Sequence, residues 1–307
     1  MALTPRRSEL ALLGVCLIWG GTFVMVKDAV TLIGPLAFLA IRFAFAAAAL
    51  LPLALAERAP VGAARGGWAP RAMAIVGTLL FAGYVLQTIG LRFTTASRAG
   101  FITGLQVVLV PLAVWALRRR RPSPRTWLAA ILSVVGLGLL AQPGATGAAL
   151  PRQILGDMLV LGCAAAFALH IVAIGAFASG TPPLRLALGQ IVVAGSLAAV
   201  GAASFETLVW PIPTPVLAAA AFTGVLATAV AFGIQTTAQR HVTPERTGLI
   251  FATEPVFAGL FGMALAGDVL RAPGWAGAAL VVVAMALGGS GRPTAAPRPA
   301  EPMEGLV

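Results

Sequence analysis

Apolar segments long enough to cross a lipid bilayer recur along almost the whole chain. About 20 apolar residues in a helix cover the roughly 30 Å of hydrocarbon in a membrane. Only 10% of the 307 residues are charged, too few to cover the surface of a water-soluble protein of this size. The sequence therefore predicts an all-α integral membrane protein. Its ten expected transmembrane helices lie near residues 10–29, 35–56, 71–91, 97–117, 126–142, 154–177, 184–205, 215–238, 244–266 and 273–290.

Short polar segments rich in proline, glycine and arginine separate these runs, and none is long enough to form another domain. The first run follows two arginines, as a signal peptide would. No A-x-A cleavage site follows it promptly, so we expect it to remain as a helix. The tail at 291–307 is rich in proline, alanine and glycine without an apolar period, which predicts a disordered cytoplasmic segment.

Basic residues are unevenly distributed between the predicted loops. The formal net charge of +11 would suggest a nucleic-acid partner in a soluble chain. With residues 1–9 placed in the cytoplasm, alternation through ten spans puts most arginines, including Arg118–Arg121, on the cytoplasmic side. We therefore expect both termini in the cytoplasm, a multi-pass location in a bacterial-type inner (plasma) membrane, and contact of this arginine run with anionic lipid rather than nucleic acid.

The segment QTIGLRFTTASRAG at 87–100 has a second copy in the chain. Residues 235–248 read QTTAQRHVTPERTG, and an offset of 148 residues aligns the two copies. The same offset, without a gap, aligns further polar, aromatic, glycine and proline residues. These pairs are Gly14 with Gly162, Trp19 with Phe167, Pro35 with Pro183, Arg42 with Gln190, Tyr84 with Phe232, Gln106 with Glu254 and Trp127 with Trp275. The chain is therefore predicted to be a duplication of a five-helix unit.

A unit of five helices has an odd number of crossings, so its second copy enters the membrane from the opposite side. The expected architecture is two inverted five-helix repeats, at 10–145 and 153–290, around a central cavity. Inverted repeats related by a pseudo-two-fold axis in the membrane plane are typical of secondary transporters. Because the duplication supplies the pseudo-symmetric pair within one chain, we expect a monomer.

Four segments resemble the EamA type of the drug/metabolite transporter superfamily. They are LIWGGTFVMVK at 17–27, AIRF at 40–43, ASRAGFITGLQVVLVPL at 96–112 and PERTGLIFATEPVFAGLFG at 244–262. The resemblance covers residues 8–290 and extends to the amino-acid and metabolite exporters typified by YddG. It implies that the first four helices of each half surround a cavity and that the fifth and tenth lie at the periphery. The sequence departs from the family pattern at Phe167, where tryptophan is frequent, and at His170, where tyrosine is common.

Polar and aromatic side chains within the spans are the candidates for lining such a cavity, because polar groups are costly in a bilayer unless they face the bundle interior or water. Tyr84 and Gln87 share a helix face, as do Phe232 and Gln235. Amides offer donors and acceptors to a small zwitterion, and aromatic rings bury its apolar part. The candidate substrate-binding residues are Trp19, Phe23, Tyr84, Gln87, Gln106, Phe167, His170, Phe232 and Gln235. The alternative is helix packing or interhelical hydrogen bonding.

That alternative is favoured for two neighbours on the same helical stripe, Thr228 and Gln239. Arg42, seven residues into its span, either attracts a substrate carboxylate or forms an ion pair that holds the bundle closed. We favour the ion pair, because a permanent charge this deep needs a constant partner. Glu254, followed by proline, either shapes a helix crossing, which we favour, or carries a proton in antiport. Gly100 and Gly248, equivalent in the repeat, are candidate hinges.

The sequence carries no pattern that indicates catalysis or a cofactor. It lacks a G-x-x-x-x-G-K-[ST] phosphate loop, an H-E-x-x-H motif and a mid-span serine with a matched histidine. Cys16 and Cys163 lie inside apolar spans, so we expect neither a disulfide nor a metal site. The leading interpretation is a non-enzymatic secondary transporter that exports small organic metabolites, chiefly amino acids. A passive channel or lipid scramblase is the alternative, and an intramembrane enzyme is less favoured.

Overall fold

The computed structural model describes residues 4–58, 67–119, 121–141, 151–266 and 271–289, and every regular element in these ranges is helical. The tail that the sequence predicts to be disordered lies outside them. The helices are α1 (Pro5–Gly20), α2 (Phe23–Leu32), α3 (Pro35–Ala56), α4 (Pro70–Gly90), α5 (Ala96–Gly104), α6 (Gln106–Arg118), α7 (Pro124–Ala141), α8 (Pro151–Phe177), α9 (Pro183–Phe205), α10 (Thr214–Gly224), the π-helix η2 (Val225–Val230), α11 (Ala231–Ala238), α12 (Pro244–Phe251), α13 (Glu254–Ala266) and α14 (Ala272–Gly289).

Proline is the first residue of many of these helices, where its missing N–H would have no partner in any case. Threonine side chains cap two equivalent helices. The hydroxyl of Thr95 accepts a hydrogen bond from the Arg98 backbone N–H at 3.2 Å, and that of Thr243 accepts one from the Arg246 N–H at 3.3 Å. Such caps satisfy a donor that the first turn would otherwise leave free, so they fix where α5 and α12 begin.

Six helical stretches in the described residues are long and apolar enough to cross a membrane. They are Pro35–Ala56, Pro70–Gly90, Arg98–Arg118, Arg152–Phe177, Pro183–Phe205 and Thr214–Ala238. α1 and α2, bent by 44° at their junction, would together give a seventh. α7 and α14 are apolar but shorter, and α12 and α13 are separated by a break. The structure thus shows an all-helical protein with several membrane-like helices, while the predicted count of ten spans is not confirmed.

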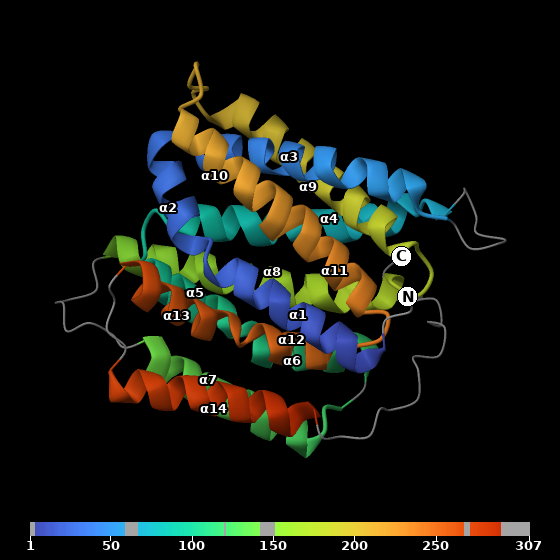
Figure 1. The fold of residues 1–307 in the computed structure, drawn as a ribbon, viewed down its shortest axis with the longest axis vertical. Coiled ribbons are helices and arrows are strands. Elements are labelled where there is room, and N and C mark those ends of the chain that lie inside the picture. Colours follow the sequence, from blue (N-terminus) through green and yellow to red (C-terminus); the bar gives the residue numbers. More distant parts are fainter. Residues whose placement is uncertain (1–3, 59–66, 120, 142–150, 267–270, 290–307) are drawn as a thin grey trace.

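The helices form one bundle with α7 and α14 packed against each other along one edge (Figure 1). Glycine lets these two backbones approach closely: a Cβ added to Gly136 would lie 2.7 Å from the carbonyl oxygen of Gly277. α3, α9 and α10 lie at the opposite edge, and α1, α8 and α11 run between the two edges (Figure 1). The central helices therefore have neighbours on both sides and can enclose an interior site.

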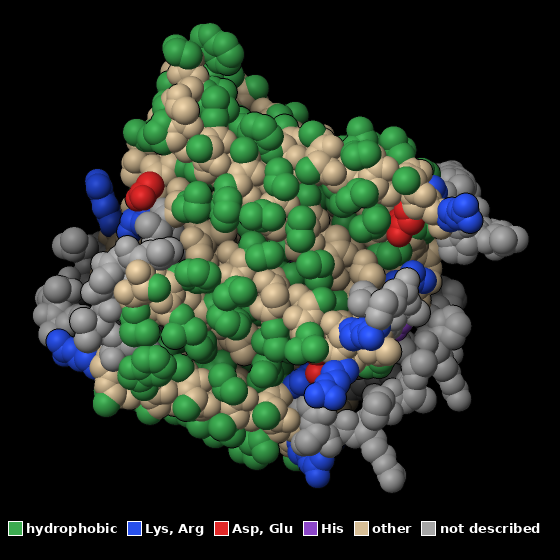
Figure 2. Space-filling model, in the orientation of Figure 1, with side chains coloured by type: hydrophobic (Ala, Val, Ile, Leu, Met, Phe, Trp, Pro, Cys, Tyr) green, Lys and Arg blue, Asp and Glu red, His purple; other side chains and the backbone are tan. Residues whose placement is uncertain are grey.

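The outer surface is apolar between two charged edges. Figure 2 shows a broad hydrophobic face, with lysine, arginine and acidic side chains gathered at opposite margins. Large apolar side chains are exposed on the surface of the molecule, such as Val200 at 67% and Phe205 at 84%. A continuous apolar face of this kind would be unstable in water and marks contact with lipid.

Three interruptions divide the helices near the middle of the bundle. Leu105 separates α5 from α6, and Ala252 and Thr253 separate α12 from α13, so the two breaks stand at positions related by the offset of 148. Gly21 and Thr22 separate α1 from α2, whereas α8 runs without a break through the equivalent residues. η2 likewise has no π-helical equivalent in α4. The two halves are therefore alike at the α5–α6 and α12–α13 breaks. They differ at the α1–α2 break and at η2, each of which is present in one half alone among the described residues.

Candidate functional site

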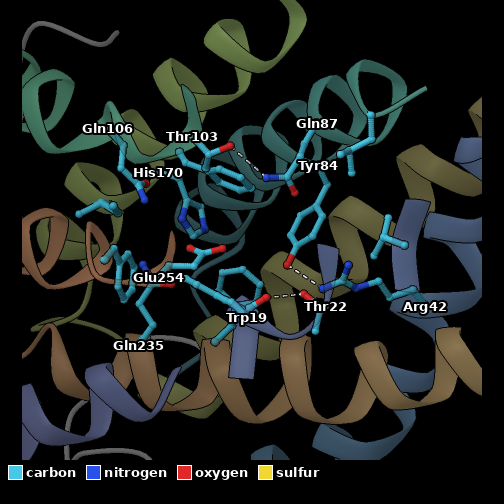
Figure 3. Close-up of a pocket in the computed structure, with 16 residues that line it drawn as sticks. Trp19, Thr22, Arg42, Tyr84, Gln87, Thr103, Gln106, His170, Gln235 and Glu254 are labelled. Carbon is cyan, nitrogen blue, oxygen red and sulfur yellow. Dashed lines mark hydrogen bonds between the residues drawn. The ribbon is translucent and has the colours of Figure 1, made fainter. Parts of the chain in front are cut away.

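A pocket lies in the interior of the bundle and is lined by residues from both halves of the chain (Figure 3). Its lining consists of Trp19, Thr22, Val26, Arg42, Tyr84, Gln87, Leu91, Thr103, Gln106, Phe167, His170, Ile171, Phe232, Gln235, Phe251 and Glu254. These residues come from α1 to α6, α8, α11, α12 and α13 or from the turns beside them. No described residue of α7 or α14 contributes, so the pocket belongs to the central part of the bundle.

Eight of the nine candidate substrate-binding residues line this pocket. The ninth, Phe23, begins α2, and its side chain lies outside the part that the structure describes. Arg42 and Glu254 line the same pocket. Sequence reasoning did not select six further lining residues, which are Thr22, Val26, Leu91, Thr103, Ile171 and Phe251. The pocket thus brings the candidates together, while their role in binding a substrate stays a prediction.

Residues at the offset of 148 meet in this pocket. Six pairs of lining residues are related in this way: Trp19 with Phe167, Thr22 with His170, Tyr84 with Phe232, Gln87 with Gln235, Thr103 with Phe251, and Gln106 with Glu254. The chemistry within a pair is similar, mostly aromatic with aromatic and amide with amide or acid. The pocket therefore takes equivalent contributions from the first and the second half of the chain.

Aromatic rings form a connected wall of the pocket. The Trp19 ring lies 5.0 Å from Phe251 and 5.7 Å from Phe232, measured between ring centroids. Tyr84 contacts Phe167 edge to face at 5.5 Å. Tilted and edge-to-face contacts are the preferred arrangements of aromatic pairs and add to the stabilisation from burial. This wall can cover the apolar part of a small solute.

Arg42 is buried at the side of the pocket next to Tyr84 (Figure 3). Its Nε donates to the Thr228 hydroxyl at 2.9 Å, and its Nη2 donates to the Tyr84 hydroxyl at 3.0 Å. The guanidinium carbon also lies 4.5 Å from the centre of the Tyr84 ring, a cation–π contact. The acidic partner expected for Arg42 is not found among the described residues, because neutral oxygens occupy these positions. In the described part of the chain Arg42 therefore makes neutral contacts, and its predicted ion pair stays a prediction.

The π-helix η2 supplies backbone and side-chain partners to the pocket. The indole Nε1–H of Trp19 donates to the carbonyl oxygen of Ala227 at 2.8 Å. Thr228 donates to the carbonyl oxygen of Thr223, five residues earlier, at 2.9 Å. A π-helical turn shifts the backbone hydrogen-bond register and leaves carbonyl groups open to other donors. η2 thereby links α1, through Trp19, and α3, through Arg42, to the span that carries α11.

The amide side chains of Gln87 and Gln235 have different hydrogen-bond partners. Gln87 donates to the Thr103 hydroxyl at 3.3 Å, and both line the pocket. Gln235 donates to Gln239 at 2.9 Å, and Gln239 donates to the Ile171 carbonyl oxygen at 2.8 Å. Gln239 and Thr228 thus make the interhelical hydrogen bonds expected of them. The side-chain oxygen of Gln235 is buried and has no hydrogen-bond partner among the described residues.

Glu254 opens α13 immediately after the break that follows α12. Its side chain is buried, and among the described residues no donor lies within hydrogen-bond distance of its carboxylate. In Figure 3 this carboxylate lies in the pocket toward His170. The His170 ring is held on its other side by Gln190, with Nε2 and Oε1 2.6 Å apart. The pocket thus holds one carboxylate, of Glu254, and one guanidinium, of Arg42, and neither forms an ion pair with another described residue.

The candidate hinges lie inside regular helical turns. Gly100 belongs to α5 and Gly248 to α12, and the interruptions follow four or five residues later. A Cβ at Gly100 would meet nothing within 4 Å, whereas one at Gly248 would approach a Val110 methyl at 3.0 Å. Close packing against Val110 therefore explains why a small residue stands at Gly248. The hinge role of both glycines stays a prediction.

Two ion pairs occupy opposite ends of the bundle. Arg98 at the start of α5 pairs with Asp157 in α8, whose carboxylate also accepts from the Thr94 hydroxyl at 2.7 Å. Arg246 at the start of α12 pairs with Glu9 in α1 at 2.8 Å. Figure 1 places the beginnings of α5 and α8 at one end and those of α1 and α12 at the other. Both arginines and both acids are related by the offset of 148, so the two pairs are equivalent.

The fold and the pocket together define a class: a multi-pass membrane protein with an interior site of small-molecule type. The model of the EamA-like transporter family matches the chain twice, at residues 6–142 and 154–288. The protein therefore belongs to the EamA-like transporter family, within the drug/metabolite transporter superfamily, which confirms the resemblance seen in the sequence.

Similar proteins agree with this assignment. An uncharacterized transporter of Archaeoglobus fulgidus is 33% identical over 278 residues, which are 91% of this chain and 84% of that protein. The uncharacterized transporter YwfM of Bacillus subtilis is 23% identical over 207 residues, covering 64% of this chain and 67% of the relative. A solved crystal structure at 21% identity shares the fold, with a TM-score of 0.74 over 92% of this chain and 96% of that one. The relatives from Archaeoglobus fulgidus and Bacillus subtilis are named as uncharacterized transporters, without a stated substrate.

Proposed function

We propose that the protein is a secondary transporter that exports small organic metabolites, with amino acids as its main substrates, by alternating access across the inner membrane. The observation that carries the proposal is the pocket in which six pairs of residues at the repeat offset meet. A site built equally from two related halves can be presented to either side when the halves exchange conformations. A small zwitterion suits its mixture of amides, aromatic rings and one charge of each sign.

The proposed carrier has ten spans in two inverted repeats at 10–145 and 153–290, with both termini in the cytoplasm. Three observations support this arrangement. The family model matches each half separately, the breaks at the α5–α6 and α12–α13 junctions are equivalent, and the two ion pairs follow the same offset at opposite ends. The excess of arginine in alternate loops supports the cytoplasmic placement of the termini.

Alternating access gives the two ion pairs opposite roles. Opening toward the outside would separate Arg98 from Asp157, while Arg246 and Glu9 remain paired and close the cytoplasmic side. Opening toward the cytoplasm would reverse this. Gly100 and Gly248 are the proposed hinges, because each lies two residues after an ion-paired arginine and shortly before a helix break. Glu254 shapes the α12–α13 junction, and proton exchange is its second proposed role.

The proposal is tested with purified protein in liposomes. Labelled amino acids should enter at a saturable rate, and unlabelled amino acid trapped inside should accelerate that entry by counterflow. A screen over amino acids and cationic drugs, with and without an imposed pH gradient, identifies the substrate and any coupling to protons. Flux that rises linearly with concentration and ignores the trapped substrate would contradict a carrier and indicate a passive channel.

A further inference from the structure

Arg42 is a buried cation whose contacts use only part of its guanidinium group. Its side chain is 3% exposed, and its Nε and Nη2 donate to neutral oxygens of Thr228 and Tyr84. Nη2 also approaches the carbonyl oxygen of Ala227 at 3.5 Å. No oxygen of the described residues lies within hydrogen-bond distance of Nη1. Burying a charge without a counter-ion is costly, and the described residues place no anion in contact with Arg42.

The duplication shows that the fold does not require a charge at this position. The residue equivalent to Arg42 is Gln190, which is fully buried and contacts the His170 ring at 2.6 Å. The residue equivalent to Glu254 is Gln106, also buried and also lining the pocket. A neutral amide therefore serves the same place in the other half. The charges of Arg42 and Glu254 are the features that the architecture itself does not explain.

We propose that Arg42 binds the carboxylate of the transported solute, so that small carboxylates, amino acids among them, are the substrate class and their decarboxylated amines are rejected. This inference rests on the proposed function. The Nη1 group of the guanidinium, which has no hydrogen-bond partner among the described residues, can donate a charge-assisted hydrogen bond to a carboxylate oxygen. The Tyr84 hydroxyl, which accepts from Nη2, carries an O–H that would turn to donate to the same carboxylate.

The remaining pocket accounts for the other parts of an amino acid. The aromatic wall formed by Trp19, Phe232 and Phe251 can cover an apolar side chain. Glu254 offers a carboxylate to the ammonium group from the same pocket. The ammonium and carboxylate groups of the solute would thus supply the counter-charges of Glu254 and Arg42 together. When the pocket opens and the solute leaves, water would solvate the two side chains instead.

The test compares three matched ligands in the liposome counterflow assay: phenylalanine, its amide and phenethylamine, or the same triplet built on the amino acid that exchanges fastest. Loss of a charge-assisted hydrogen bond is expected to weaken competition by the amide and the amine about 10- to 100-fold. Arg42→Gln copies the residue of the other half and should reduce that preference to about threefold or less. Arg92→Gln, which removes a charge at an exposed position, should leave the preference unchanged.

Two results would overturn the inference. One is equal competition by the three ligands in the unaltered protein, a measurement that requires no variant. The other is an Arg42→Gln protein that weakens all three alike, since a purely structural arginine would act in that way. If this variant does not fold, Arg42→Lys replaces it and should retain a reduced preference for the carboxylate.

Failure of the proposed function is recognised separately. If no amino acid shows saturable exchange, the same triplet is added to the detergent-purified protein and its melting temperature is measured. Stabilisation by the carboxylate ligand that Arg42→Gln abolishes would support the binding role of Arg42 although the transport proposal fails. Equal stabilisation by the amide would reject both.

Discussion

Arg246 at the start of α12 donates two hydrogen bonds to the carboxylate of Glu9 in α1, from Nε at 2.8 Å and from Nη2 at 3.0 Å. The equivalent Arg98 contacts Asp157 at the other end of the bundle. Each pair joins one half of the chain to the other. In a carrier with two gates, one pair must separate for each opening while the other keeps the opposite side closed.

Removing either acid should therefore shift the carrier toward one facing state. Glu9→Gln should open the end that carries Arg246, and Asp157→Asn should open the end that carries Arg98. A partly exposed ion pair contributes about 1 kcal/mol, so each change should alter the populations by about fivefold. Labelling of the cysteine introduced by Thr103→Cys, with reagents added to one side of the membrane at a time, measures the change. The native Cys16 and Cys163 are fully buried, which keeps the background low.

The control for charge alone is Asp28→Asn, at an exposed position of α2. It should leave the labelling from both sides unchanged. If Glu9→Gln and Asp157→Asn increased labelling from the same side, the two ion pairs would be ordinary stabilising contacts rather than opposite gates.

We expect some amide side chains to contribute to transport and another to contribute to stability. Gln87→Ala combined with Gln235→Ala removes two groups that face the pocket, and we expect transport to fall about tenfold or more, because each lost hydrogen bond contributes about 1 kcal/mol. Gln239→Ala should instead lower the melting temperature, since Gln239 holds the Ile171 carbonyl oxygen. Counterflow rates and thermal unfolding in detergent provide the two measurements. Unaltered transport in the double variant would indicate that Gln87 and Gln235 contribute to helix packing and not to transport.

The indole N–H of Trp19 should stabilise the π-helix. Trp19→Phe keeps an aromatic ring against Phe251 but removes the donor to the Ala227 carbonyl oxygen. Loss of a buried hydrogen-bond partner is expected to reduce the free energy of unfolding by about 1–3 kcal/mol. Trp115→Phe is the matched control, because Trp115 is 44% exposed on α6. Equal melting temperatures for the two variants would show that the contact with η2 contributes nothing measurable.

Helical phase and the repeat carried enough information to predict most of the pocket. Tyr84 and Gln87 share a face at a spacing of three, and the offset extended that face to Phe232 and Gln235. The same offset relates Thr103 to Phe251 and Asp157 to Glu9, so the sequence carries a signal for these residues as well. Val26 and Leu91 carry no such signal, because an apolar residue that lines a cavity is indistinguishable from one that packs.

Backbone irregularities were less predictable. η2 consists of Val225–Val230, and VLATAV has no proline or glycine to mark a π-helix. Its register depends on donors from α1 and α3, which are distant in sequence. The neutral contacts of Arg42 with Tyr84 and Thr228 have no sequence signal either, because these residues lie on helices that are distant from it along the chain.

Two glycines on one helix provide a test of how α7 and α14 are held together. A Cβ at Gly136 would lie 2.7 Å from the Gly277 carbonyl oxygen, whereas one at Gly138 would meet nothing within 4 Å. Gly136→Ala should therefore force the two helices apart and reduce the free energy of unfolding by about 1–3 kcal/mol, while Gly138→Ala should be neutral. Because no described residue of α7 or α14 lines the pocket, the folded Gly136→Ala protein should keep its KM in counterflow. Equal destabilisation by both changes would attribute the effect to helix flexibility rather than to close approach of the backbones.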